Sequence, residues 1–124
     1  MDYKEIIAWE IKNWNVYIDE HSSCWSRMHV HVKERRICKF ISKDSYSALL
    51  DLLHEIGHIE TDRASMKRAE SESEATLWAI NRLKELGLPI KRKPLRKYKD
   101  YIRMTYDRGI RRGLQKRIKS KLYI

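Results

Sequence analysis

Apolar residues recur along the chain at two different spacings, and these spacings separate helices from strands. Over residues 2–13 they recur every three or four positions, which predicts a helix. Residues 15–19, 28–32 and 36–41 instead alternate apolar and polar side chains, the pattern of a half-buried strand. A polar turn at Lys33–Arg35 separates the last two runs. We therefore expect a small sheet of three strands, mostly antiparallel.

Helical spacing returns in the second half of the chain. One helix should begin near Ser45 and run to about Glu60, and another should begin near Ala69 and end at Gly87-Leu88-Pro89. A third should have Pro94 in its first turn, a position that suits proline. Its apolar stripe is predicted to comprise Leu95, Tyr98, Ile102, Tyr106, Ile110, Leu114, Ile118 and Leu122.

Length and composition restrict the class of protein. A chain of 124 residues with 42% hydrophobic positions allows one compact domain with its own core. The sequence has no apolar run of membrane-spanning or secretory length, and it has only two cysteines, so we expect a cytoplasmic protein with reduced thiols. The expected fold class is α+β. Residues 1–90 should form the core, and residues 91–124 a basic amphipathic helix packed on it.

Positive charge is concentrated at the end of the chain. Of the 27 Lys and Arg residues, 14 lie within residues 91–124, where Asp100 and Asp107 are the only acids. Such a segment suits a polyanionic partner such as a nucleic acid, although the same pattern also arises on a helix face that merely contacts water. The sequence leaves both interpretations open.

The sequence His54-Glu55-Ile56-Gly57-His58 lies inside the helix predicted over residues 45–60 and has the spacing H-E-x-x-H. Histidines four apart on a helix lie about one turn apart on the same face, so both imidazoles can reach one metal ion, and Zn²⁺ suits such ligands. Glu55 projects about 100° away from His54, beside the metal face, where a general base is needed. The alternative is a pair of surface histidines without a metal.

A catalytic zinc site needs a third protein ligand, and the next predicted helix offers Glu70, Glu72 and Glu74. Glu74 shares its side of that helix with Leu77 and Trp78, whereas Glu72 is rotated by about 160° from it. We therefore predict Glu74 as the third ligand, with Glu70 as the second choice. The alternative is that all three carboxylates are solvated and only favour the helix N-terminus.

Other residues are weaker candidates. His29 and His31 point the same way from their predicted strand, so they form a candidate metal pair, but we favour the interpretation that they are exposed to water opposite Val30 and Val32. A group that stabilises an oxyanion cannot be singled out among His29, His31, Arg103 and Tyr106.

Together, the motif from His54 to His58 and the segment E-A-x-x-W-A, from Glu74 to Ala79, resemble the ImmA/IrrE-type metallopeptidases. The resemblance covers about residues 37–87. It implies a minimal zincin-like fold, Zn²⁺ held by His54, His58 and Glu74, and Glu55 as catalytic base. Only 15 residues separate His58 from Glu74, a short interval for this family. Family members commonly cleave DNA-bound repressors of mobile elements, which implies a protein substrate of that kind.

Two functional hypotheses follow. The first is a zinc metallopeptidase that hydrolyses a peptide bond in a protein or peptide, with Glu55 activating the attacking water. The second is a module that binds nucleic acid or a protein partner through its basic C-terminal helix and has an inactive zincin core.

Overall fold

The structure is a computed structural model that describes residues 2–20, 28–38, 40 and 44–111. Within them it has four helices and a three-stranded mixed sheet, which confirms the expected α+β class. The elements, in chain order, are α1 (Tyr3–Asn13), β1 (Tyr17–Asp19), β2 (His29–His31), β3 (Arg36–Cys38), α2 (Tyr46–Thr61), α3 (Arg68–Glu85) and α4 (Arg92–Arg111).

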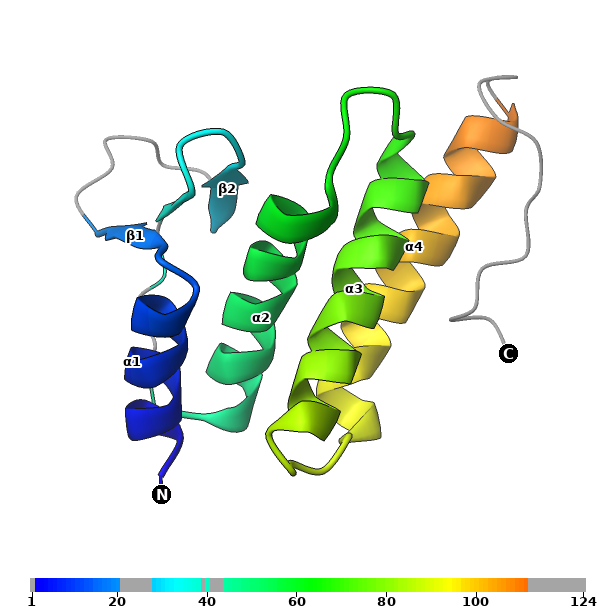
Figure 1. Cartoon of the computed structure of the whole chain (residues 1–124). Coiled ribbons are helices and arrows are strands. Elements are labelled where there is room, and N and C mark those ends of the chain that lie inside the picture. Colours follow the sequence, from blue (N-terminus) through cyan, green and yellow to red (C-terminus); the bar gives the residue numbers. More distant parts are fainter. Residues whose placement is uncertain (1, 21–27, 39, 41–43, 112–124) are drawn as a thin grey trace.

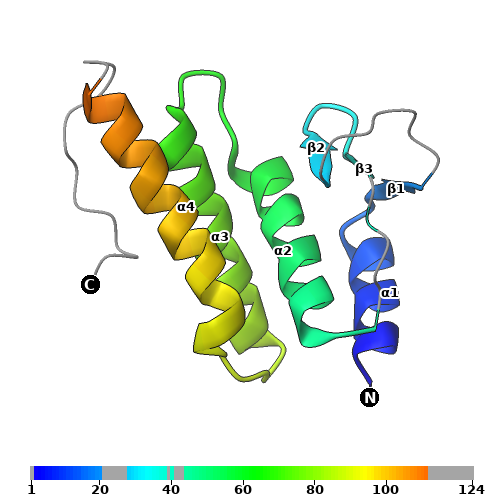
Figure 2. The same cartoon turned by 180° about the vertical axis from the view of Figure 1, so that it is seen from behind.

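The four helices lie side by side in chain order, and the sheet lies beyond the end of α1 and beside α2 (Figures 1 and 2). This order places α2 between α1 and the sheet on one side and α3 on the other. Helix α4 covers α3 and also contacts α2. The middle of α2 is therefore surrounded by other elements on several sides.

Helix α2 is the centre of the core. Leu49, Leu50, Leu52 and Leu53 are all at most 1% exposed, so apolar side chains cover more than one face of this helix. A helix that is apolar on most sides is stable only when other elements surround it. The side chain of Ser45 begins α2 by accepting a hydrogen bond from the backbone N–H of Ala48 at 3.1 Å.

The sheet has the order β1-β3-β2 and differs from the expected, mostly antiparallel one. Strands β2 and β3 are antiparallel, whereas β1 pairs with β3 in parallel, with Ile18 opposite Ile37. The alternation of side chains fixes which residues face the core, and Ile37 is indeed fully buried. It does not fix strand direction, which is set by how the chain returns from β1 to β3.

Helices α2 and α3 approach closely at a point where neither has a large side chain. A Cβ atom added to Gly57 would lie 2.5 Å from the backbone oxygen of Ala75, and Ala75 itself is fully buried. The backbone of α3 cannot move aside as a flexible side chain would. Glycine at position 57 therefore sets the spacing between the two helices.

We expect Gly57→Ala to destabilise the protein, although alanine by itself favours a helix by about 1 kcal/mol. Forcing a methyl group into a packed contact costs about 1–3 kcal/mol, and a backbone obstacle favours the upper end of that range. The expected net loss in free energy of unfolding is about 2 kcal/mol, measured by denaturant titration. The control Ser47→Ala, at an exposed position of the same helix, should change stability by less than about 0.5 kcal/mol. Unchanged or increased stability of Gly57→Ala would contradict the close contact.

Helix α4 packs on α3 through apolar side chains at its predicted stripe. Ile102 and Tyr106 form a small buried cluster with Ala69, to which Leu77 and Ile80 of α3 also pack. The predicted stripe positions Leu114, Ile118 and Leu122 lie outside the described residues, as does the side chain of Ile110. Among the described residues, no helix has the length and apolar character needed to cross a bilayer.

Candidate metal centre

The two histidines of α2 and one glutamate of α3 meet inside the protein. His54 and His58 are 3% and 6% exposed, and their Nε2 atoms are 3.2 Å apart. The Oε2 atom of Glu72 lies 2.9 Å from Nε2 of His54 and 3.3 Å from Nε2 of His58. Two imidazole nitrogens and one carboxylate oxygen thus form a compact triangle across the two closely packed helices.

The size of this triangle fits a metal ion. Bonds of about 2.0–2.1 Å in a tetrahedral arrangement place neighbouring ligand atoms roughly 3.3 Å apart. The three distances in the protein, 2.9, 3.2 and 3.3 Å, are close to that value. The His54, His58 and Glu72 group could therefore hold a metal ion with little rearrangement.

Hydrogen bonds on the far side of each imidazole direct the Nε2 lone pairs towards the triangle. The Thr76 hydroxyl donates to the backbone oxygen of Glu72 at 2.9 Å, so it accepts from Nδ1–H of His54 at 3.1 Å. Nδ1 of His58 lies 3.1 Å from both carboxylate oxygens of Asp62. Since Nδ1 carries the proton in each ring, Nε2 is left as the metal ligand, an arrangement common at metal-bound histidines.

Electrostatics favour a cation in the triangle. Burial alone would raise the pKa of Glu72, but its close contacts with the imidazoles of His54 and His58 outweigh burial and hold this pKa below its usual range. Burial alone would lower the pKa of His58, but the hydrogen bond and charge of Glu72 raise it to about 9. Burial lowers the pKa of His54. The group thus keeps a carboxylate charged next to one protonated imidazole, and a metal ion can replace that proton.

Glu55 follows His54 on α2, and both residues line a cleft that opens beside the triangle. It is 9% exposed, and burial raises its pKa to about 7. A carboxyl group that ionises near neutral pH can both accept and return a proton, which is what a general base and acid must do. Glu55 does not belong to the ligand triangle.

The structure differs from the sequence prediction in which carboxylate joins the histidines. Glu74 is exposed, and together with Glu70 it lies near Tyr106 of α4. The prediction assumed that the large apolar residues of α3 face α2. The side of α3 that carries Glu72 continues instead through Thr76, Ala79 and Leu83, all at most 1% exposed, and small residues there permit the close approach at Gly57.

A cleft of about 860 Å³ opens beside the triangle. It is lined by His54, Glu55 and Glu72, by Met28 and His29 of the β2 region, and by residues of α4 that include Tyr98 and Tyr101. From α4, the ring of Tyr98 stacks on His54 at 4.3 Å between centroids. The hydroxyl of Tyr98 donates to Asp51, which also pairs with Lys97 at 2.7 Å.

Several residues around the triangle and the cleft were not predicted from the sequence. Asp62 follows His58 by four positions and Thr76 follows Glu72 by four, so helix spacing carried a usable signal for both. No local pattern marks Tyr98 or Tyr101, because they reach the cleft only through the packing of α4. Of the earlier oxyanion candidates, His29 lines the cleft, whereas His31, Arg103 and Tyr106 do not.

Comparison of the chain with known protein families, with characterised proteins and with solved structures finds no match. The function of the protein is therefore inferred from its side chains.

Proposed function

We propose that the protein is a zinc metallopeptidase. The observation that supports this most is the convergence of His54, His58 and Glu72 within 3.3 Å of one another, with Glu55 beside them in an open cleft. Two imidazoles and a carboxylate are a usual ligand set of hydrolytic zinc, and they leave a fourth position for water or substrate. The resemblance likewise takes two ligands from H-E-x-x-H and one from the following helix, although it implied Glu74 where the structure has Glu72.

The chain's own residues supply the remaining parts of a hydrolysis. Zinc bound to the triangle would supply a Lewis acid that makes water more acidic and polarises the peptide carbonyl. Glu55 then accepts the proton of the attacking water and returns it to the leaving nitrogen. Arg68 donates two hydrogen bonds to the hydroxyl oxygen of Tyr101, at 2.9 and 2.6 Å, which leaves the Tyr101 O–H to donate into the cleft. Tyr101 is therefore our candidate for stabilising the oxyanion.

The proposed substrate is a peptide segment of a protein. An open cleft with floor and walls from four elements admits an extended chain more readily than a small metabolite pocket would. The resemblance noted above suggests a DNA-bound regulator as the natural substrate.

A peptide-cleavage assay tests the proposal directly. The metal-free protein should not cleave a mixed-sequence peptide library, and Zn²⁺ should restore cleavage seen by mass spectrometry. Excess chelator should abolish cleavage again, because the three ligands and not a covalent nucleophile carry the reaction. The proposal would be contradicted if the zinc-loaded protein cleaved no peptide of the library and no DNA-bound protein of the cells from which it comes.

The outer face of α4 supports a second candidate, binding to a nucleic acid. Its exposed side chains include Arg92, Lys93, Arg96, Lys99 and Arg108. In the same assay series, absence of cleavage together with duplex DNA binding that weakens steeply with salt would favour this second function.

A further inference from the structure

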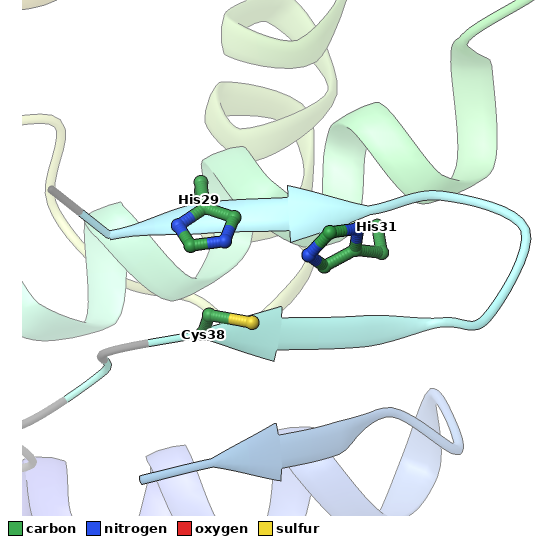
Figure 3. Close-up of side chains that lie close together, drawn as sticks. All are labelled: His29, His31 and Cys38. Carbon is green, nitrogen blue, oxygen red and sulfur yellow. The ribbon is translucent and has the colours of Figure 1, made fainter. Parts of the chain in front are cut away.

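The sheet carries a second group of metal-binding side chains, separate from the triangle on α2 and α3. His29 and His31 belong to β2 and Cys38 to β3, and one ligand atom from each lies within 4.8 Å of the others. Figure 3 shows both rings and the thiol on the same face of the two strands. We propose that His29, His31 and Cys38 form a second metal site, for a thiophilic ion such as Zn²⁺.

The strand register explains why these three residues meet. His29 lies directly opposite Cys38 in the antiparallel pair, and opposite residues on neighbouring strands have their Cβ atoms about 5 Å apart. His31 is two residues beyond His29, so its side chain emerges on the same face. The two rings lie 5.1 Å apart at an interplanar angle of 74°. Backbone pairing thus holds the ligands together without any contribution from the helices.

The donor set indicates what kind of ion fits. One thiol and two imidazoles prefer zinc or copper ions over Mg²⁺ or Ca²⁺, which prefer oxygen. Binding requires the Cys38 thiol to release its proton to solvent, after which sulfur and the two nitrogens bond to the ion. Bonds of about 2.3 Å to sulfur and 2.0–2.1 Å to nitrogen require the ligand atoms to approach each other more closely than 4.8 Å, which side-chain rotation can supply.

The charge of the neighbouring arginine does not oppose a cation here. Arg36 lies opposite His31 in the register, and its guanidinium pairs with Asp19 at 3.3 Å and with Glu34 at 2.8 Å. Its positive charge is therefore balanced by two carboxylates.

Such a site would join two very short strands. Strand β2 has three residues and lies at the edge of the sheet, where it pairs with β3, so few backbone hydrogen bonds hold it in place. An ion shared by both strands would fix β2, and His29 also lines the cleft beside the triangle. The second site would thus stabilise one wall of that cleft, whatever reaction takes place there.

Cobalt binding can test the second site, because only a thiolate ligand gives a sulfur-to-cobalt charge-transfer band in the near ultraviolet. The metal-free Cys24→Ser protein, in which Cys38 is the one remaining thiol, should develop this band when Co²⁺ is added. The triangle of His54, His58 and Glu72 contains no sulfur and gives no such band. His58→Ala in the same background should therefore keep it, even if the metallopeptidase proposal fails.

The histidine variants complete the test. His29→Gln and His31→Gln, each with Cys24→Ser, should weaken the cobalt affinity reported by the thiolate band at least about tenfold, with an unchanged far-ultraviolet circular dichroism spectrum. Cys38 is buried, so Cys38→Ser can also affect folding, and the histidine variants avoid that difficulty. Absence of the band in Cys24→Ser, or a cobalt affinity in either histidine variant equal to that of Cys24→Ser, would overturn the proposal.

Discussion

Replacing Glu55 with glutamine should lower peptide hydrolysis by about 10²–10⁴-fold while leaving zinc bound, because general-base catalysis contributes about that factor. Glutamine has nearly the same shape as glutamate but cannot accept a proton at neutral pH. Glu55 lies in the cleft outside the ligand triangle, so its replacement removes no bond to the metal. Cleavage rates of zinc-loaded protein on the peptide library measure the first effect, and metal analysis after dialysis measures the second.

Glu60→Gln is the matched control. Glu60 belongs to the same helix but is exposed and pairs with Arg35 at 2.7 Å, away from the residues that line the cleft. We expect it to retain full activity and zinc. Full activity in Glu55→Gln would remove Glu55 from the proposed reaction, and loss of zinc in that variant would show that Glu55 supports the metal site instead.

Glu72→Gln should lower zinc affinity by at least about 100-fold, whereas Glu74→Gln should leave it unchanged. Loss of a residue that only supports a ligand typically costs 10–100-fold in affinity, so loss of a ligand itself should cost at least as much. The neutral amide cannot balance the charge of the ion, and it leaves two histidines as the only remaining ligands. Competition with a zinc-binding dye measures both affinities.

The pair of glutamates makes this comparison informative because they are only two residues apart on α3. Glu72 reaches both imidazoles, while Glu74 is exposed on another side of the same helix. The two variants change charge and composition equally. A loss of zinc in Glu74→Gln with normal binding by Glu72→Gln would restore the ligand expected from the sequence and contradict the arrangement in the structure.

Periodicity predicted the helices well because each depends on local spacing. The helices expected over 45–60 and 69–87 are found at Tyr46–Thr61 and Arg68–Glu85. The meeting of His54 with His58 is equally local, since one helical turn relates them. Strand direction was wrong in part, because the alternation of side chains is the same in a parallel and an antiparallel pair.

The third ligand of the triangle could not be predicted from the pattern of one helix alone. Choosing between Glu72 and Glu74 depends on which side of α3 faces α2, and the large apolar residues suggested the wrong side. The close contact between Gly57 and Ala75 decides it, and such a contact depends on both helices at once. For the same reason, nothing in the sequence near Tyr98 indicated that it stacks on His54.

The metal ligands and the cleft wall come from different elements, so each can change without the other. The triangle and Glu55 all come from α2 and α3, whereas much of the cleft wall comes from the β2 region and α4. Under the proposed function, substitutions at Met28 or Lys97 would therefore alter selectivity without disturbing the ligand geometry. Under the same proposal, variants that keep α2 and α3 but differ in the cleft wall would bind different peptides and cleave them with the same residues.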